Sequence, residues 1–305
     1  MGPVLILGNG ADLDLGLNTS FTSFRCSKYW KQYIEDKDSK DAELTSFLNT
    51  KTSGDWCDLE SCLVSYGQQL KVKLDEEVEL DKKSYIALCK QLHFFLDEAQ
   101  SANIKDESIL LDILRRIKES RKGMIMYTFN YTDLSRIIQR KGIGIEQSPT
   151  YIHGSLNSED ELILGIGEDD INSKYFFLHK TARPNYFPTN IVWDLMRAND
   201  VIIFGHSLNE IDAPYFKDFF ESRSQYNSNR RDDRITIFTK NEESKMKIQH
   251  SMKKWGINIM ALTSISRLNF ICTDEYAEGN AYAIKAYDTF VNCLKGRKVE
   301  NDRNI

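Results

Sequence analysis

Hydrophobic and polar residues follow two different patterns along the chain. From about residue 27 to about residue 121, large apolar side chains recur three and four positions apart, and this segment contains no proline. Such spacing gives a helix one buried face. We therefore predict a helical segment, with helices over residues 28–37, 58–77 and 83–100.

From residue 123 onward, short apolar runs alternate with amphipathic stretches. Strands that alternate with helices in this way predict a parallel sheet covered by helices. The predicted helices are residues 189–200, a segment from residue 212, 241–255 and 277–294. The predicted strands are residues 4–7, 124–129, 150–154, 161–165, 201–205, 234–239 and 268–273.

These two patterns predict the domain organisation. We expect an α/β fold with a doubly wound, mainly parallel, Rossmann-like sheet formed by residues 1–26 and 122–294. Residues 27–121 would form a large helical insertion after the first strand. Residues 295–305 would form a polar tail.

Composition and charge narrow the class of protein. The chain has 305 residues, of which 41% are hydrophobic and 28% charged, as in ordinary globular proteins. A net charge of -5 gives no reason to expect binding to nucleic acid or to an anionic membrane. The six cysteines include no close CxxC pair, so neither a zinc module nor a disulfide framework is expected. No apolar stretch is long enough to span a bilayer and no basic leader precedes the first strand, so we expect a cytoplasmic protein.

Polar residues follow four predicted strands at the point where each strand ends. In a parallel sheet these carboxyl ends share one edge, which is where α/β proteins bind ligands. The residues offer amide, imidazole and hydroxyl groups, which exchange hydrogen bonds and carry little fixed charge. The candidates are Gly8, Asn9, Gly10, Asp12, Asn130, His153, Gly205, His206, Ser207, Asn209 and Asp212.

Several candidates also have a structural explanation. A Gly-x-Gly segment after a strand suits a phosphate-binding loop or a plain turn, and this one lacks the third glycine of the ordinary dinucleotide fingerprint. Asn130 is well suited to cap the helix that follows it. His153 and His206 are compatible with buried, satisfied histidines. Asp12 and Asp14 are two positions apart, on different faces of a helix, so we do not expect them to act as an acid–base pair.

Taken in order, the candidates resemble a known family, the abortive-infection AbiH family of bacterial phage-defence proteins. The resemblance covers most of the chain and implies a role in anti-phage defence. Ala11 stands where phenylalanine is common and Asn18 where proline is common, and neither change removes a polar group. The segments that carry the resemblance are Gly8-Asn9-Gly10 with Gly16, Trp56-Cys57-Asp58-Leu59-Glu60, Phe129-Asn130-Tyr131, Ile152-His153-Gly154, and Gly205-His206-Ser207-Leu208-Asn209 with Asp212.

A second resemblance is to the sirtuin-like NAD-binding superfamily. Its first loop has the form GAGxSxxxGIP, and residues 8–17 are similar to it with all three glycines in register. Its later motifs resemble Asn130, His153-Gly154 and residues 205–207, where His206 replaces the usual small hydroxyl residue. The zinc-binding cysteine pairs of the deacylase sirtuins are absent from the sequence. The resemblance therefore implies NAD hydrolysis without a metal, rather than protein deacylation.

The sirtuin-like resemblance also implies chemical roles for several candidates. Cleavage of nicotinamide from ribose passes through an oxocarbenium-like state and needs one directed nucleophile. His153 would be the general base, and Asn130 would orient the nicotinamide ribose or the attacking water. The glycines of the first loop would let the backbone approach the pyrophosphate. Candidates for contacts to ribose hydroxyls are Ser207, Asn209 and Asp212.

Three functions follow from the sequence and stay open. The protein is an NAD-cleaving effector, a sensor that binds NAD or a related nucleotide without turnover, or an interaction protein. In the third case the helical insertion would bind a partner of a defence system or a second copy of the chain. A nuclease is the poorest fit, because no carboxylates cluster with metal spacing and residues 230–234 carry mixed charge.

Overall fold

The computed structural model describes residues 2–37, 39–51, 56–68, 73–120, 123–144, 147–156, 162–167, 171–184, 186, 189–225 and 233–295. The side chains of residues 56–58 lie outside this description, and so does the first part of the Trp56–Glu60 motif. The tail beyond residue 295 and most of the mixed-charge segment 230–234 also lie outside it.

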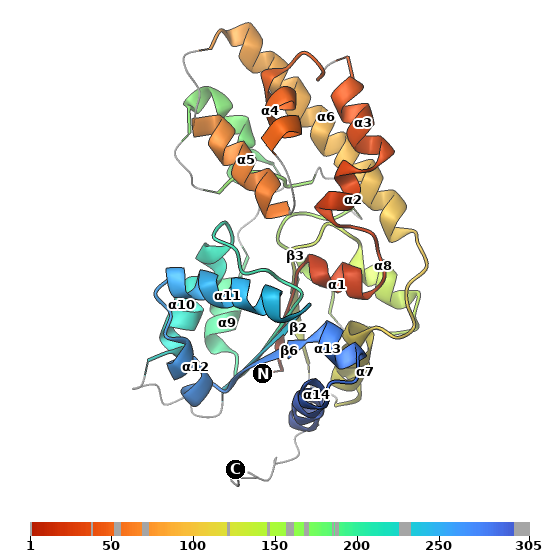
Figure 1. Ribbon diagram of the computed structural model, residues 1–305, viewed down its shortest axis with the longest axis vertical. Helices are drawn as coiled ribbons and strands as arrows, with labels where there is room; N and C mark the ends of the chain where they lie inside the picture. Colours follow the sequence, from red (N-terminus) through yellow and green to blue (C-terminus); the bar gives the residue numbers. More distant parts are fainter. Residues whose placement is uncertain are drawn as a thin grey trace.

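A six-stranded parallel sheet forms the centre of the lower lobe in Figure 1. The order β3-β2-β1-β4-β5-β6 is that of the doubly wound, Rossmann-like fold, which confirms the predicted fold class. The chain changes direction across the sheet between β1 and β4, and ligands bind at such a switch point in this class of fold. The strands are β1 (Val4–Leu7), β2 (Ile125–Thr128), β3 (Thr150–Tyr151), β4 (Asp200–Phe204), β5 (Arg234–Thr239) and β6 (Leu268–Cys272).

Helices cover both faces of the sheet because alternate strand residues point to opposite sides. Leu5 and Leu7 of β1 pack in one core, and Val4 and Ile6 pack in the other. The first core is closed by α1 (Asn9–Asp14), α7 (Ile109–Glu119), α8 (Leu134–Gln139) and α14 (Ala281–Leu294). The second is closed by α9 (Ile191–Arg197), α10 (Ala213–Arg223), α11 (Glu242–Lys254) and α12 (Ile259–Ile265), and the short α13 (Thr273–Ala277) follows β6.

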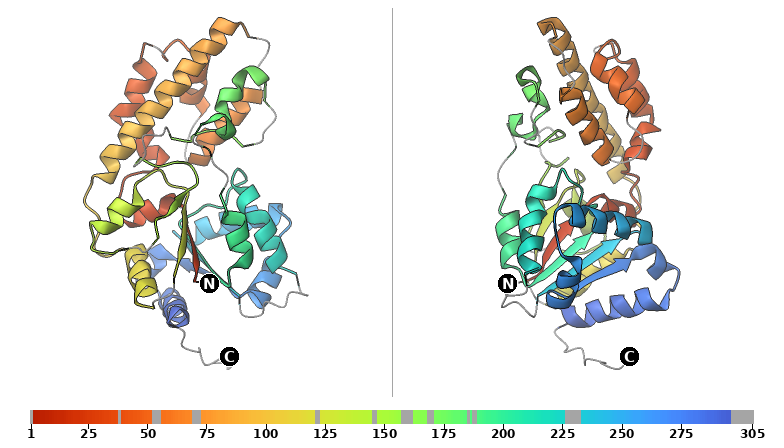
Figure 2. Two further views of the ribbon diagram at one scale, coloured as in Figure 1. Left: turned by 180° about the vertical axis from the view of Figure 1, so that it is seen from behind. Right: turned by 60° about the vertical axis from the view of Figure 1, so that its left-hand side comes forward.

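The upper lobe is helical and has its own core. It contains α2 (Phe21–Arg25), α3 (Lys28–Glu35), α4 (Glu43–Lys51), α5 (Trp56–Gln68) and α6 (Asp75–Gln100). The segment after β3, with the 3-10 helices η1 (Ser173–Leu178) and η2 (Lys180–Ala182), lies against these helices in the views of Figure 2. Leu164, Tyr175 and Leu178 of this segment are buried in the insertion's core. Conversely, α7 falls within residues 27–121 but packs on the sheet.

The strand predicted over residues 161–165 is wrong for its described part, which runs as irregular chain from residue 162. Its apolar side chains are buried because Leu162 and Leu164 enter the core of the insertion, not because the run joins the sheet. The helix predicted over residues 58–77 ends at Gln68, and α6 begins at Asp75. The short helix α12 was not predicted.

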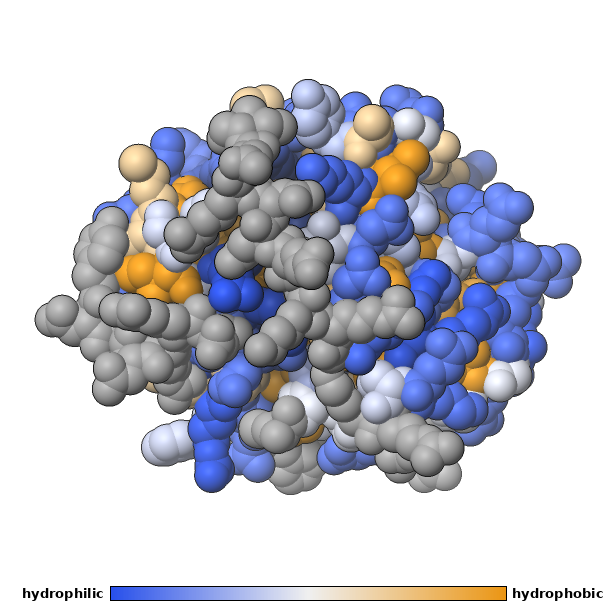
Figure 3. Space-filling model, turned by 90° about the horizontal axis from the view of Figure 1, so that it is seen from below, coloured by the Kyte–Doolittle hydropathy of each residue, from blue (hydrophilic) through white to orange (hydrophobic). Residues whose placement is uncertain are grey.

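In the described part of the chain, none of the helices has the length and apolar character needed to cross a membrane. The face away from the insertion carries mostly hydrophilic residues, with apolar residues in several separate places (Figure 3). Scattered apolar residues of this kind are ordinary on protein surfaces.

Candidate functional site

The loops that follow β1 and β4 are in direct backbone contact at the switch point. The amides of Gly8 and Gly10 donate hydrogen bonds to the carbonyls of Phe204 and Gly205, at 3.0 and 2.9 Å. A Cβ on Gly8 would lie 2.6 Å from the Cα of His206, and one on Gly10 would lie 2.6 Å from the Cα of Gly205. The close approach of two loops therefore requires both glycines, and their amides are already bonded within the protein.

The loop after β4 is a compact turn. Gly205 has a φ of +64° and Leu208 a φ of +49°. Backbone conformations with positive φ are strained for residues other than glycine. The Leu208 amide donates to Nδ1 of His206 at 3.0 Å, which fixes the imidazole and turns its Nε2 toward Asp212. Ser207 is exposed, and Asn209 donates to its hydroxyl and accepts from the Asp212 amide.

Asn130 follows β2 and is held by the first loop. Its Nδ2 donates to the carbonyl of Gly8 and to Oδ1 of Asp12, both at 3.0 Å. Because both amide hydrogens are used, the side chain offers a ligand only its Oδ1 as an acceptor. The capping interpretation is wrong for Asn130, since Asp133 caps α8 by accepting from the Arg136 amide.

Asp12 is buried behind Asn130. Its carboxylate accepts from the Nδ2 of Asn130 and from the hydroxyl of Thr132, each at 3.0 Å. Burial raises the pKa of Asp12 to about 6, although these hydrogen bonds lower it. Asp14 points elsewhere and accepts from Ser108 and from the Leu110 amide at the start of α7, so the two carboxylates do face different ways. Asp12 thus orients Asn130.

Asn9 lies at the start of α1, beside the same loop. Its side-chain oxygen accepts a hydrogen bond from the hydroxyl of Thr19 at 2.8 Å. This bond ties the first loop to the chain that leaves α1.

His153 follows β3 and is 6% exposed. Its Nε2 lies 3.1 Å from Nζ of Lys180 and 3.9 Å from Oδ1 of Asp212. An ammonium group only donates, so Nε2 accepts and the imidazole is neutral. Burial, together with the charge of Lys180, lowers the pKa of His153 to about 3, although Asp212 acts in the opposite direction.

Asp212 stands at the N-cap of α10 but does not cap it, because its side chain makes no capping hydrogen bond. Its Oδ2 lies 3.3 Å from Nε2 of His206. Its Oδ1 is buried and has no hydrogen-bond partner among the described residues. Burial raises the pKa of Asp212, but the hydrogen bond from His206 and the charge of Lys180 outweigh it and hold the pKa below its usual value.

Two further charged residues complete the site, and sequence reasoning did not select them. Lys180 of η2 and Glu60 of α5 form an ion pair of 2.9 Å, with exposed fractions of 5% and 7%. Burial lowers the pKa of Lys180, but the charges of Glu60 and Asp212 outweigh burial and raise it. Glu60 ends the quoted Trp56–Glu60 motif, which was the available signal, whereas no pattern around Lys180 marks it.

Aromatic rings enclose the two histidines. The ring of Phe129 lies 5.4 Å from that of His153 and 4.4 Å from that of His206, measured between centroids. Tyr131 lies 6.2 Å from His153 and is partly buried. These rings surround the imidazoles with apolar surface, which strengthens every charge interaction nearby.

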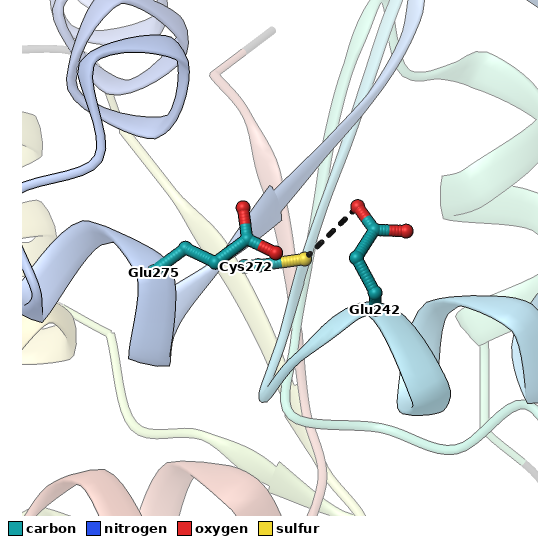
Figure 4. A group of neighbouring side chains, drawn as sticks. All are labelled: Glu242, Cys272 and Glu275. Atoms are coloured by element: carbon teal, nitrogen blue, oxygen red, sulfur yellow. Dashed lines mark hydrogen bonds between the residues drawn. The ribbon is translucent and has the colours of Figure 1, made fainter.

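A separate group of side chains that could hold a metal ion lies at the end of β6, between α11 and α13 (Figure 4). The ligand atoms of Glu242, Cys272 and Glu275 are within 4.8 Å of one another. Lys245 already pairs with Glu242 at 2.8 Å, and burial raises the pKa of Cys272 to about 11. A protonated thiol and a neutralised carboxylate do not favour a cation, so this group is explained by the hydrogen bond from Cys272 to Glu242.

The fold and the site define an α/β protein of the doubly wound class, with buried polar residues at the switch point of its sheet. Residues 4–231 match the family described as Bacteriophage abortive infection AbiH. The chain belongs to this family. The matched range includes the helical insertion together with Asn130, His153, Lys180 and Asp212. No curated protein matches the chain.

Proposed function

We propose that this AbiH protein is a phage-defence effector that binds NAD and cleaves its bond between nicotinamide and ribose, and that loss of NAD aborts infection. Membership of the abortive-infection family supports the defence role. The Rossmann-like strand order and the sirtuin-like form of residues 8–17 support NAD as the ligand.

The buried, unpartnered oxygen of Asp212 carries the proposal. Among the described residues, no donor reaches its Oδ1, which lies beside His153. A buried carboxylate oxygen without a donor is costly unless a ligand supplies a positive charge or a hydroxyl. The oxocarbenium-like state of glycosidic cleavage supplies positive charge at the anomeric carbon, and ribose supplies hydroxyls.

The neighbouring groups suit the remaining steps. A water oxygen attacks the anomeric carbon, and the bond to nicotinamide breaks with its electron pair leaving on the ring nitrogen. Oδ1 of Asn130 accepts a hydrogen bond from this water or from the ribose. His153 is neutral and takes the proton that the water gives up, after Nε2 exchanges its hydrogen bond from Lys180 for one from the water.

Nicotinamide and ADP-ribose release from NAD by purified protein tests the proposal. We expect the wild type to release both products and His153→Ala to lose at least about 100-fold in rate, as removal of a general base does. His250→Ala is the matched control, since His250 is exposed on α11 and should leave the rate unchanged. Equal rates for the wild type and His153→Ala would refute the assigned base.

The contact between Lys180 and His153 favours one alternative, a nucleotide sensor. In the described state Nε2 of His153 already accepts from Lys180, and a sensor needs no free base. A sensor would be stabilised against heat by NAD without releasing nicotinamide. The assay above and a thermal shift with NAD, run on the same preparation, separate the two functions.

A further inference from the structure

A chain of three charged or titratable groups crosses from the insertion to the sheet. Glu60 comes from α5, Lys180 from η2 and His153 from the loop after β3. The contacts are 2.9 Å between Glu60 and Lys180 and 3.1 Å between Lys180 and His153. Both Glu60 and Lys180 lie on segments that pack in the core of the insertion, whereas His153 lies at the edge of the sheet.

The donors and acceptors of this chain allow only one arrangement of protons on His153. The ammonium of Lys180 donates and cannot accept, so Nε2 of His153 carries a lone pair. A neutral imidazole with a lone pair on Nε2 carries its proton on Nδ1. The ring also makes a hydrogen bond with the backbone of Phe129.

We propose that Lys180, anchored by Glu60, is a positioning residue that holds His153 as the neutral Nδ1–H tautomer, with the Nε2 lone pair accepting from Lys180. This inference rests on the proposed function, in which the Nε2 lone pair receives the proton of the nucleophile. The insertion would thereby set the protonation of a base that belongs to the sheet.

The groups around His153 explain why Lys180 is needed for this. Asp212 at the start of α10 would favour a charged imidazole, whereas His206 after β4 opposes it. Tyr131 after β2 packs beside the ring, and Glu60 of α5 acts through its pair with Lys180. Burial already disfavours the imidazolium, and the charge of Lys180 adds to that effect and counters Asp212.

Nitrogen NMR of the histidine rings tests the proposal without any nucleotide. The signals of His153 are assigned by their loss in His153→Gln. In the wild type we expect Nδ1 to be protonated and His153 to stay neutral between about pH 5 and about pH 8. In Lys180→Met the same ring should protonate at a pH higher by about one unit or more, a tenfold change in its proton affinity.

Two further variants provide controls. Lys180→Arg keeps the positive charge and should keep His153 neutral, which a purely structural role of the side chain does not require. Lys174→Met removes an exposed lysine of η1 whose partner is Asp75, and should leave His153 unchanged. A wild-type ring protonated on Nε2, or the same titration in the wild type and Lys180→Met, would overturn the proposal.

The test separates this inference from the proposed function. If His153 behaves as expected but no nicotinamide is released, the positioning role stands and glycosidic cleavage fails. If nicotinamide is released but the ring titrates alike with and without Lys180, the positioning role fails alone. Where both hold, the acid limb of the rate profile should shift to higher pH in Lys180→Met.

Discussion

The partners of single side chains decide their roles in this site. Asn130 donates both amide hydrogens to the protein, so its remaining acceptor defines what it can offer a ligand. Asp12 is the acceptor that fixes this orientation. The protonation of Asp12 also affects the stability of the folded protein. Asp212 is the opposite case, because its buried Oδ1 has no hydrogen-bond partner among the described residues.

Asp12 should make the stability of the protein depend on pH. Its pKa is about 6 in the folded protein, above its usual 3.8, so the folded state retains the proton more tightly than the unfolded state. This contribution is full below the unfolded pKa and is lost as the pH rises through about 6. Relative to Asp12→Asn, the wild type should lose on the order of 2–3 kcal/mol of unfolding free energy between acid and neutral pH.

Urea unfolding of both proteins at several pH values measures this difference. The comparison with Asp12→Asn removes the contributions of other titrating groups, including Asp212, whose lowered pKa acts in the opposite direction. Parallel curves for the two proteins would show that Asp12 has an ordinary pKa.

Asn130→Ala should lower the unfolding free energy by about 2 kcal/mol, because a buried carbonyl and a buried carboxylate each lose a donor. Asn190→Ala is the control, since the exposed Asn190 makes no capping hydrogen bond and the change should cost less than about 0.5 kcal/mol. Denaturant unfolding measures both. Equal losses would mean that the amide of Asn130 is not bonded as described.

The sequence predicted several residues of the site, but it did not predict the structural role of all of them. Asn130, His153 and Asp212 could be found because the carboxyl ends of parallel strands share one edge. Gly8 and Gly10 were expected to admit a pyrophosphate, whereas the structure explains both by contact with the loop after β4. Lys180 reaches the site through tertiary packing, which local patterns do not encode.

At the scale of elements, the loops after β1 and β4 approach each other so closely that a Cβ on Gly8, Gly10 or Gly205 would clash with backbone atoms. Six of the predicted strands lie in the sheet. The run over residues 161–165 failed because burial in a helical core produces the same pattern of apolar residues. An apolar run shows that a segment is buried, not what it is buried against.

Gly205→Ala should be far more destabilising than Gly142→Ala. Both glycines have positive φ, +64° and +69°, so the backbone strain of alanine is alike. A Cβ on Gly205 would lie 2.4 Å from the Cα of Gly10, whereas a Cβ on Gly142 would have nothing within 4 Å. We expect a loss of about 1 kcal/mol for Gly142→Ala and over about 3 kcal/mol for Gly205→Ala.

Thermal or denaturant unfolding of the two variants tests this. Similar losses in both would contradict the close contact of the two loops.

At the scale of the molecule, the site is shared between two lobes. The sheet supplies Asn130, His153 and Asp212, while segments packed in the insertion supply Glu60 and Lys180. Figures 1 and 2 show the insertion standing over the carboxyl ends of the strands. Removal of the insertion would therefore remove Glu60 and with it part of the site.

Binding of NAD should protect the insertion as well as the sheet. In hydrogen exchange with NAD we expect slower exchange in α5, which carries Glu60, and in the loop after β1. The helix α12 lies at the far end of the lower lobe and should exchange as before (Figure 1). Protection confined to the loops of the sheet would show that the insertion does not take part in the site.

The central claim is the proposal that this AbiH protein stops infection by cleaving NAD, with His153 as the general base. Measurement of the NAD content of infected cells tests this claim most directly. Infection supplies whatever trigger the protein needs. Cells with the wild type should lose most of their NAD and accumulate nicotinamide after infection, whereas cells with His153→Ala should keep their NAD and release phage. Protection against phage while NAD stays constant, or equal NAD loss with His153→Ala, would contradict the account.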